Sequence, residues 1–208
     1  MEERNNMTAE RSLEIIRESI ERSQHAITKN SALPMVWWGI CVVFFSLLIA
    51  YLWKNHGGPA WNFLWAAMWL IGYIGNRIFD KKKETVPTTF VAKTISHVWG
   101  TFGIFCGGIG IVFGLIGCGI LPEELITPNI FIVGCITSVI SLCFGMGTTM
   151  TGFIVKNRII QIFGIIAGIG GFFYALRFPD YQQLFVMAGV AVIGLIVPGL
   201  ILHLQNKK

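Results

Sequence analysis

The sequence predicts an all-α, polytopic membrane protein with six transmembrane helices and both ends of the chain in the cytoplasm. Three observations predict it: few charges, six long apolar segments, and an uneven distribution of basic residues. Of the 208 residues, 54% are hydrophobic and only 13% are charged. A soluble domain carries about 25% charged residues, so this chain has too few charges to cover a water-facing surface.

Six apolar segments are long enough to cross the roughly 30 Å of hydrocarbon in a bilayer, which takes about 20 helical residues. They cover residues 34–53, 59–79, 97–120, 128–155, 158–176 and 182–204. Their apolar residues do not alternate with period two, so these segments are predicted helices and not strands of a barrel. The first segment ends in Tyr51-Leu52-Trp53-Lys54 without a small-residue cleavage site, so we expect it to remain as an anchor.

The basic residues predict the orientation. Fourteen of the sixteen lie on one side of the predicted spans, and the other side has only Lys54 and Arg177. The fourteen are Arg4, Arg11, Arg17, Arg22, Lys29, Arg77, Lys81, Lys82, Lys83, Lys93, Lys156, Arg158, Lys207 and Lys208. By the positive-inside rule this side is cytoplasmic, which makes the chain a multi-pass protein with both termini in the cytoplasm. The bilayer accounts for the net charge of +5, so we expect no nucleic-acid partner.

Residues 1–33 differ in composition and are predicted to form a cytoplasmic amphipathic helix, while residues 34–208 form the transmembrane domain. The apolar positions repeat at intervals of 4, 3, 4 and 7 residues, which is a heptad pattern interrupted at Ser23. This predicted interaction seam consists of Ala9, Leu13, Ile16, Ile20 and Ile27.

The apolar seam needs a partner that covers it from water. The candidates are the membrane surface, the protein's own transmembrane helices, a second copy, or a cytoplasmic protein. Six acidic against five basic residues in this segment argue against an anionic-lipid anchor, which would be rich in Lys and Arg. The other three stay open. A homo-oligomer is expected, because membrane tethering raises the effective concentration of a short seam.

The first 40 residues also carry a resemblance. Ser12-Leu13-Glu14-Ile15-Ile16, a further polar helix and then Trp37-Trp38-Gly39 at the opening of the first span resemble a family of uncharacterised bacterial six-helix inner-membrane proteins with an N-terminal cytoplasmic amphipathic helix. The likeness is one of layout over most of the chain. It implies a lineage and supplies no activity.

Glycines at intervals of 3 and 4 residues predict close helix packing in spans three to five, because bare backbones can approach each other in lipid. The third span has Gly100, Gly103, Gly107, Gly110, Gly114 and Gly117. The fourth has Gly134, Ser138, Ser141, Gly145, Thr148 and Gly152, and the fifth has Gly164, Gly168, Gly171 and Ala175. We expect a tight three-helix core, with static packing as the main interpretation and a sliding or gating surface as the alternative.

A weak internal similarity predicts three parallel helical hairpins. Phe102-Gly103-Ile104 and Phe163-Gly164-Ile165 begin similar stretches, and Trp38-Gly39-Ile40 begins a fainter third copy. All three would cross the membrane in the same direction, unlike the inverted repeats of many secondary transporters.

The sequence predicts no enzyme, no catalytic residue, no metal site and no cofactor. No Asp, Glu, Lys or Arg falls near the centre of a predicted span, and there is no Gly-x-Ser-x-Gly site, HExxH helix or P-loop. The histidines, at positions 25, 56, 97 and 203, include no two at ligand spacing on one helix.

All five cysteines fall in predicted spans: Cys41, Cys106, Cys118, Cys135 and Cys143. If spans three and four form a hairpin, Cys106 and Cys143 lie at similar depth, and Cys118 and Cys135 form a second pair further out. Buried free thiols are the main expectation and a disulfide at either pair is the alternative.

Tryptophans at intervals of four residues mark the second span. Trp61, Trp65 and Trp69 fall on one helical face, to which Asn76 returns, with Arg77 at the inner end. One interpretation is an aromatic wall that binds a flat or cationic ligand. The alternatives are packing of large side chains against the glycine ridges and exposure to lipid.

These observations leave three hypotheses for function. The first is a non-enzymatic, homo-oligomeric inner-membrane protein with a cytoplasmic interaction or regulatory helix. The second is a small-molecule carrier, or the substrate-binding subunit of an importer, with a closed cavity at Trp65 or Trp69. The third is an oligomeric pore, for which Ser138, Ser141 and Thr148 offer the polar lining.

Overall fold

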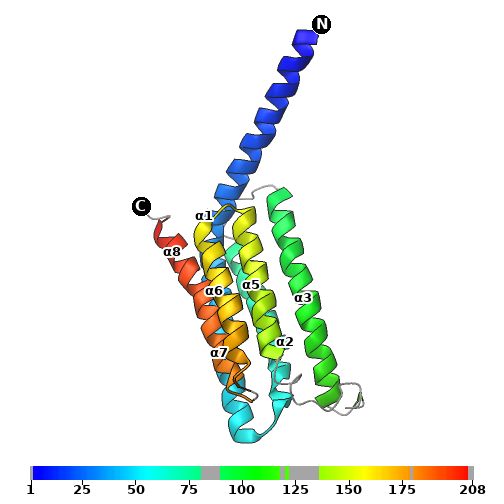
Figure 1. Cartoon of the computed structure of the whole chain (residues 1–208), viewed down its shortest axis with the longest axis vertical. Helices are drawn as coiled ribbons and strands as arrows, with labels where there is room; N and C mark the ends of the chain where they lie inside the picture. The colour runs from blue at the N-terminus through cyan, green and yellow to red at the C-terminus, as the bar shows by residue number, and fades with distance from the viewer. Residues whose placement is uncertain (1, 81–89, 118–119, 122–135, 179, 206–208) are drawn as a thin grey trace.

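A computed structural model describes residues 2–80, 90–117, 120–121, 136–178 and 180–205 (Figure 1). Within these ranges all regular structure is helical, which confirms the predicted all-α class. The elements are α1 (Glu2–His56), the 3₁₀ helix η1 (Pro59–Phe63), α2 (Leu64–Asp80), α3 (Phe90–Gly117), α5 (Ile136–Ile154), α6 (Arg158–Ala175), α7 (Gln183–Ala191), the π-helical turn η3 (Val192–Ile196) and α8 (Val197–Gln205).

Five of the described helical segments are long and apolar enough to cross a membrane, where the sequence predicted six. They lie in α1, α3, α5, α6 and the continuous segment from α7 to α8. The predicted second span follows the turn at Gly57 and Gly58, where φ is 77° and 84°, and begins at Pro59 as a 3₁₀ helix that continues into α2. Its α-helical part, α2, has 17 residues and a length of about 26 Å.

The helices run up and down, so both chain ends lie at the same end of the bundle (Figure 1). The last predicted span is one segment with a π turn at η3, directly before Pro198. Proline lacks a backbone N–H and its ring crowds the preceding turn, and a π turn relieves this crowding without ending the helix.

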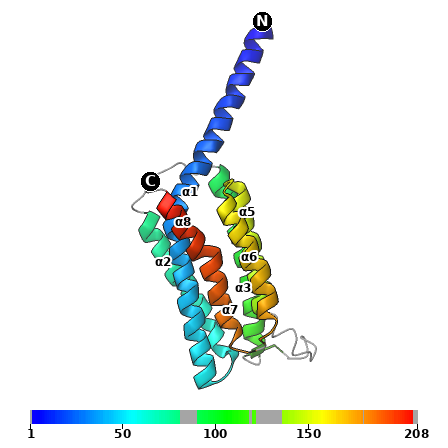
Figure 2. The same cartoon turned by 60° about the vertical axis from the view of Figure 1, so that its left-hand side comes forward.

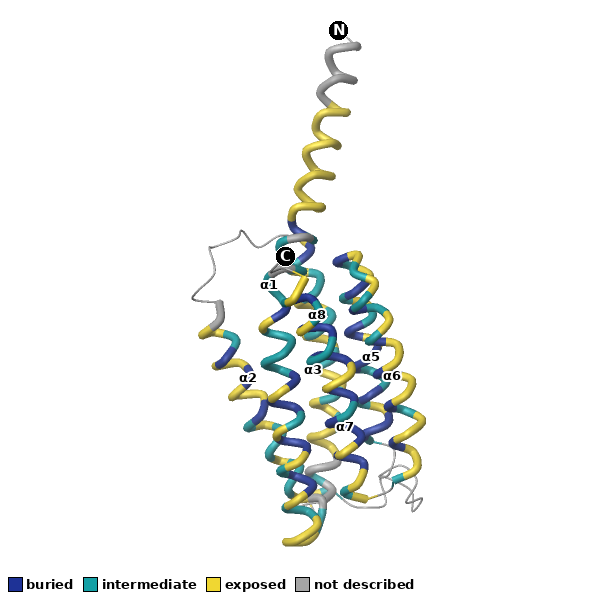
Figure 3. The backbone as a smooth tube through the Cα atoms, turned by 90° about the vertical axis from the view of Figure 1, so that its left-hand side faces the viewer, coloured by how far each residue is buried: buried dark blue, intermediate teal, exposed yellow. Residues whose placement is uncertain are grey.

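The predicted boundary between residues 33 and 34 falls inside one continuous helix, since α1 passes through Pro34 without a break. Residues 9–22, which we call the arm, are all exposed and project beyond the bundle (Figure 3). The helix meets the bundle after the arm, where Ser23 is buried and the Gln24 amide Nε2 donates to the Ile154 carbonyl at 2.9 Å.

Two cores hold the bundle together, and the segment from α7 to α8 lies between them (Figure 2). In the first, Phe45 and Ile49 of α1 pack with Leu184 and Met187 of α7. In the second, Phe144, Ala167 and Ala175 of α5 and α6 pack with Val186, Val190 and Leu195. A smaller cluster of Ala32, Val155, Ile160 and Leu202 closes the end nearest the arm.

The predicted threefold repeat is not visible in the surroundings of its glycines. Gly39 lies against Leu195 and Ile196, Gly103 has only Trp69 nearby, and Gly164 packs on Thr149. The most extensive helix contact joins α5 and α6, which belong to different predicted hairpins.

Candidate functional site

The arm presents an apolar stripe that is exposed in the part of the chain that the structure describes. Leu13, Ile16 and Ile20 are 67%, 55% and 39% exposed. Ile27, the last residue of the predicted seam, instead packs against the cluster around Ala32. The structure therefore leaves the seam residues from Ala9 to Ile20 on the surface, while Ile27 anchors the helix to the bundle.

The charges of the arm compensate one another along the same helix. Arg17 pairs with Glu21 at 3.1 Å, and Arg22 pairs with Glu18 at 3.1 Å. Each pair is exposed and spans one helical turn, a spacing that stabilises a helix by a few tenths of a kcal/mol. The two pairs thus support the helical form of the arm and leave little net charge around its apolar stripe.

A shallow hollow of about 390 Å³ lies between the arm and the turn that joins α5 to α6. Its lining residues are Leu13, Ile16, Arg17, Ile20, Glu21 and Lys156. Lys156 lies in that turn with φ of 54°. The hollow thus joins the apolar stripe of the arm to the turn between α5 and α6.

The glycines of α5 and α6 bring two helix backbones into direct contact. A Cβ atom built on Gly168 would lie 2.8 Å from the Gly145 Cα, and one built on Gly164 would lie 2.7 Å from the Thr149 Oγ1. Gly171 packs in the same way on Ser141 and Val190. These predicted packing glycines lie where only a hydrogen fits, which maximises the backbone contact that favours helix association in lipid.

The glycines of α3 lie elsewhere. Gly100, Gly107 and Gly110 have no atom within 4 Å of a built Cβ, and the surroundings of Gly114 and Gly117 fall outside the described residues, as does Gly134. The inner face of α3 has Trp99 and Phe102, whose rings pack on Phe144 at 5.9 and 6.2 Å. These rings separate α3 from α5 and turn its glycines outward, so the expected three-helix core is a two-helix core with α3 at its edge.

The tryptophans of the predicted second span do not line one cavity. Trp61 lies in η1, where the 3₁₀ geometry removes it from the α-helical face. The Trp65 indole N–H donates to the Asn62 Oδ1 at 3.1 Å. Trp69 is 45% exposed, and its ring lies edge to face with Trp38 at 5.4 Å.

The two polar residues assigned to the same ligand site also lie apart from a pocket. Arg77 is exposed and donates to the Tyr73 hydroxyl on its own helix at 2.9 and 2.7 Å, and Asn76 is half-buried beside it. A second hollow on the described surface is lined by Gly170, Phe173 and Tyr174 of α6 and by Arg177, which follows this helix. The structure therefore does not assemble Trp61, Trp65, Trp69, Asn76 and Arg77 into one binding site.

An α1–α2 contact that sequence reasoning missed uses a different pair of tryptophans. The Trp37 indole packs on Gly75 and donates to the Gly72 carbonyl at 3.4 Å, and the Trp38 ring covers Gly72. The sequence does contain the pattern that this contact uses: two adjacent tryptophans on one helix and two glycines three positions apart on the other. Large-against-small packing thus does occur, between different partners from those predicted.

The polar stripe predicted to line a pore is buried within the protomer. Ser138, Ser141 and Thr148 are 0%, 0% and 1% exposed, and the Thr148 hydroxyl donates to the Phe144 carbonyl of its own helix at 3.0 Å. A lumen between protomers would need these side chains on the outer surface. Their burial between α5 and its neighbours serves packing instead.

Three buried polar atoms lack a hydrogen-bond partner among the described residues: the Ser46 Oγ, the Ser138 Oγ and the Gln183 Oε1. Gln183 begins α7 and is 4% exposed. An unsatisfied buried carbonyl costs about 1–3 kcal/mol, whereas exchange for an apolar group of the same shape removes that cost.

We therefore predict that Gln183→Met raises the unfolding temperature of the purified protein, with a gain of about 1 kcal/mol in stability. Thermal unfolding in detergent would measure it, with Gln182→Met as the exposed neighbouring control, which we expect to be neutral. A fall in stability for Gln183→Met would mean that the amide has a partner, such as a bound water.

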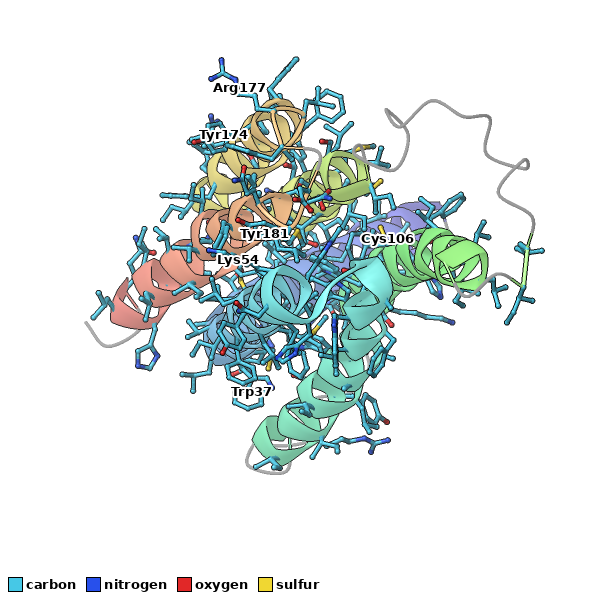
Figure 4. The ribbon with its side chains drawn as sticks, turned by 90° about the horizontal axis from the view of Figure 1, so that it is seen from below. Trp37, Lys54, Cys106, Tyr174, Arg177 and Tyr181 are labelled. Atoms are coloured by element: carbon cyan, nitrogen blue, oxygen red, sulfur yellow. The ribbon has the colours of Figure 1, made fainter. Side chains whose placement is uncertain are left out.

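The end of the bundle opposite the chain termini carries Lys54 and Arg177, seen from below in Figure 4. The Lys54 ammonium lies 5.9 Å from the centre of the Tyr181 ring. Arg177 lies close to Tyr174, which lines the same hollow. Basic and aromatic side chains thus gather at this end.

The titratable groups form no metal cluster within the described part of the chain, where no three His, Cys, Asp or Glu side chains come together. Cys41 is a buried free thiol, while Cys106 and Cys143 are half-buried free thiols on the contacting helices α3 and α5. The antiparallel contact of these helices fits the predicted equal depth of the pair. Cys118 and Cys135 lie outside the described residues.

These features define the class: an all-helical protein with several apolar helices, compatible with a multi-pass membrane protein. Comparison of the chain with protein-family models, curated proteins and solved structures gives no match. The layout resemblance of the first 40 residues stays an expectation.

Proposed function

We propose that this protein is a homo-oligomeric, multi-pass protein of the bacterial inner membrane that uses its cytoplasmic arm as an interaction surface. The observation that carries the proposal is the exposed apolar stripe of Leu13, Ile16 and Ile20 on a helix that projects beyond the bundle. Burial of a large aliphatic side chain stabilises a complex by about 1.5–3 kcal/mol. Three such side chains on one face of an exposed helix therefore favour association with a partner.

Six spans and a cytoplasmic location of both termini complete the proposal. η1 and α2 together contain 22 residues without a break, from Pro59 to Asp80, enough for a sixth crossing. Both chain ends lie at one end of the bundle, and Lys54 and Arg177 lie at the other. This arrangement supports the orientation inferred from the basic residues.

The partner that fits the arm best is a second copy of the arm. Two copies in one membrane project their arms to the same side, so the helices meet in parallel. Each seam residue then faces its own copy, as in a parallel coiled coil. Ser12 borders one side of the seam and faces Arg17 of the second copy in a parallel pair, so no like charges meet there.

The length of the arm explains why the membrane matters. Residues 9–22 supply two heptads, a length at which an isolated helix is marginal in water. Tethering both copies to one bilayer raises their effective concentration and compensates for the small seam. The absence of a basic excess on the arm argues against anionic lipid as the occupant.

Disulfide crosslinking in membranes tests the proposal. We would introduce Ile16→Cys or Ile20→Cys into a protein whose five native cysteines are replaced by alanine, and oxidise the membranes with copper phenanthroline. We expect a covalent dimer from both variants, because a parallel seam brings each position against its own copy.

Ile15→Cys is the matched control, since Ile15 is 61% exposed but lies about 100° around the helix from Ile16. It should give little dimer. Equal yields from Ile15→Cys and Ile16→Cys would indicate random collision and contradict the seam. Crosslinks from Ile16→Cys to a different protein, without a dimer, would assign the arm to a cytoplasmic partner and contradict self-association.

A further inference from the structure

We propose that Cys106 and Cys143 form a redox-active dithiol whose oxidation fastens α3 to α5 by a disulfide. The two half-buried thiols lie on the contacting helices α3 and α5. Neither belongs to the arm, so this proposal is independent of the function proposed above.

The register of the two antiparallel helices places the cysteines at the same level. The Trp99 indole N–H donates to the Thr151 hydroxyl at 3.2 Å, and about two helical turns further along the same contact α3 reaches Cys106 and α5 reaches Cys143. Both positions belong to the contacting sides of their helices. Cys106 lies one turn from Phe102, which packs on Phe144, and Cys143 lies one turn from Gly147, where a built Cβ would be 3.9 Å from the Trp99 ring.

The apolar surroundings of the two thiols determine which kind of oxidant can reach them. Phe144 follows Cys143, and Trp99 and Phe102 cover the neighbouring turns, so the thiols lie in an apolar aromatic contact. A small apolar disulfide can reach such a site, whereas a charged oxidant such as oxidised glutathione would have to shed its hydration there.

The reaction is two thiol–disulfide exchanges. The sulfur of one cysteine loses its proton and attacks the S–S bond of the oxidant, which releases one small thiol and leaves a mixed disulfide. The second cysteine loses its proton and attacks the protein sulfur of that mixed disulfide, which releases the second small thiol. The two cysteines together give up two protons and two electrons, which end on the two released thiols.

A disulfide between α3 and α5 would change how firmly α3 is held, because α3 lies at the edge of the bundle. Only 6% of the most apolar stretch of α3 is buried, against 33% in α6 and 44% in α5. Its contact with α5 relies on a few aromatic rings and one hydrogen bond. A covalent link would hold this peripheral helix in place, while the reduced pair leaves it free to separate from α5.

The experiment uses full-length protein in detergent with Cys41, Cys118 and Cys135 replaced by alanine, treated with 4,4′-dipyridyl disulfide. We expect release of two equivalents of pyridinethione per chain, an intact mass lower by two hydrogens and no retained pyridyl group. The oxidised protein should also unfold at a higher temperature than the reduced protein.

Two controls separate a true pair from two independent thiols. Cys143→Ser should release one equivalent and keep one pyridyl group on Cys106. Moving the thiol by one residue, with Leu142→Cys and Cys143→Ser together, should keep two pyridyl groups, because position 142 lies about 100° around α5. Two retained pyridyl groups on the unaltered pair, or no reaction until the protein is unfolded, would overturn the proposal, and an unchanged unfolding temperature would overturn the fastening of α3.

Discussion

Gly145→Ala is expected to lower the stability of the folded protein by about 1–3 kcal/mol, the usual cost of an extra methyl group in a filled contact. A Cβ at position 145 would overlap the backbone of Gly168 and lie 2.8 Å from the Gly164 carbonyl oxygen. Backbone atoms cannot rotate away as a side chain does, so α5 and α6 must move apart. That movement weakens the rest of their interface, where Gly164 and Gly171 make similar contacts.

Gly170→Ala provides the matched control. Gly170 lies on α6 only two residues from Gly168, but a Cβ there meets no atom within 4 Å. Alanine is a better helix former than glycine by up to about 1 kcal/mol, so this variant should be neutral or slightly more stable. Thermal unfolding in detergent would compare the two, and equal unfolding temperatures for Gly145→Ala and Gly170→Ala would contradict the close backbone contact.

Ile16→Asp is expected to weaken self-association by about 100-fold or more in the dissociation constant. Each dimer would lose the burial of two isoleucines, about 3 kcal/mol in total at the low end, and 1.4 kcal/mol corresponds to tenfold. Two like charges would also face each other across the parallel seam. Sedimentation equilibrium in detergent, or energy transfer between labelled copies in vesicles, would measure the change.

Ile15→Asp carries the same substitution on the neighbouring residue and should leave association intact. Both side chains are exposed, at 61% for Ile15 and 55% for Ile16, so neither variant should change the unfolding temperature of the bundle. Loss of association in both variants would point to a general effect of charge on the arm. Persistence of the oligomer in both would locate its interface on the bundle and not on the arm.

Sequence periodicity predicted the parts of the structure that depend on one helix at a time. The apolar segments, the spacing of Gly164, Gly168 and Gly171, and the amphipathic pattern of residues 9–27 are all properties of consecutive residues. The structure has helices in the described part of each of these stretches. The equal depth of Cys106 and Cys143 followed from assuming a hairpin, and the register of α3 against α5 agrees with it.

Contacts between helices were predicted less well, and the candidate ligand site shows why. Trp61, Trp65 and Trp69 share a face only on an ideal α-helix, and the 3₁₀ geometry after Gly57-Gly58-Pro59 removes Trp61 from that face. Trp65 satisfies its indole N–H locally at Asn62. Nothing in the spacing of the tryptophans indicated either effect.

The sequence by itself determined the all-helical class, the apolar character of the helices, and the small-residue and amphipathic faces. Tertiary structure alone decided which neighbour each face meets. Gly164 and Gly168 of α6 face a backbone, while Gly100, Gly107 and Gly110 of α3 face outward, because Trp99 and Phe102 occupy the inner side of α3. Periodicity specifies which residues share a face, but their partners depend on the volumes of side chains from several helices packed at once.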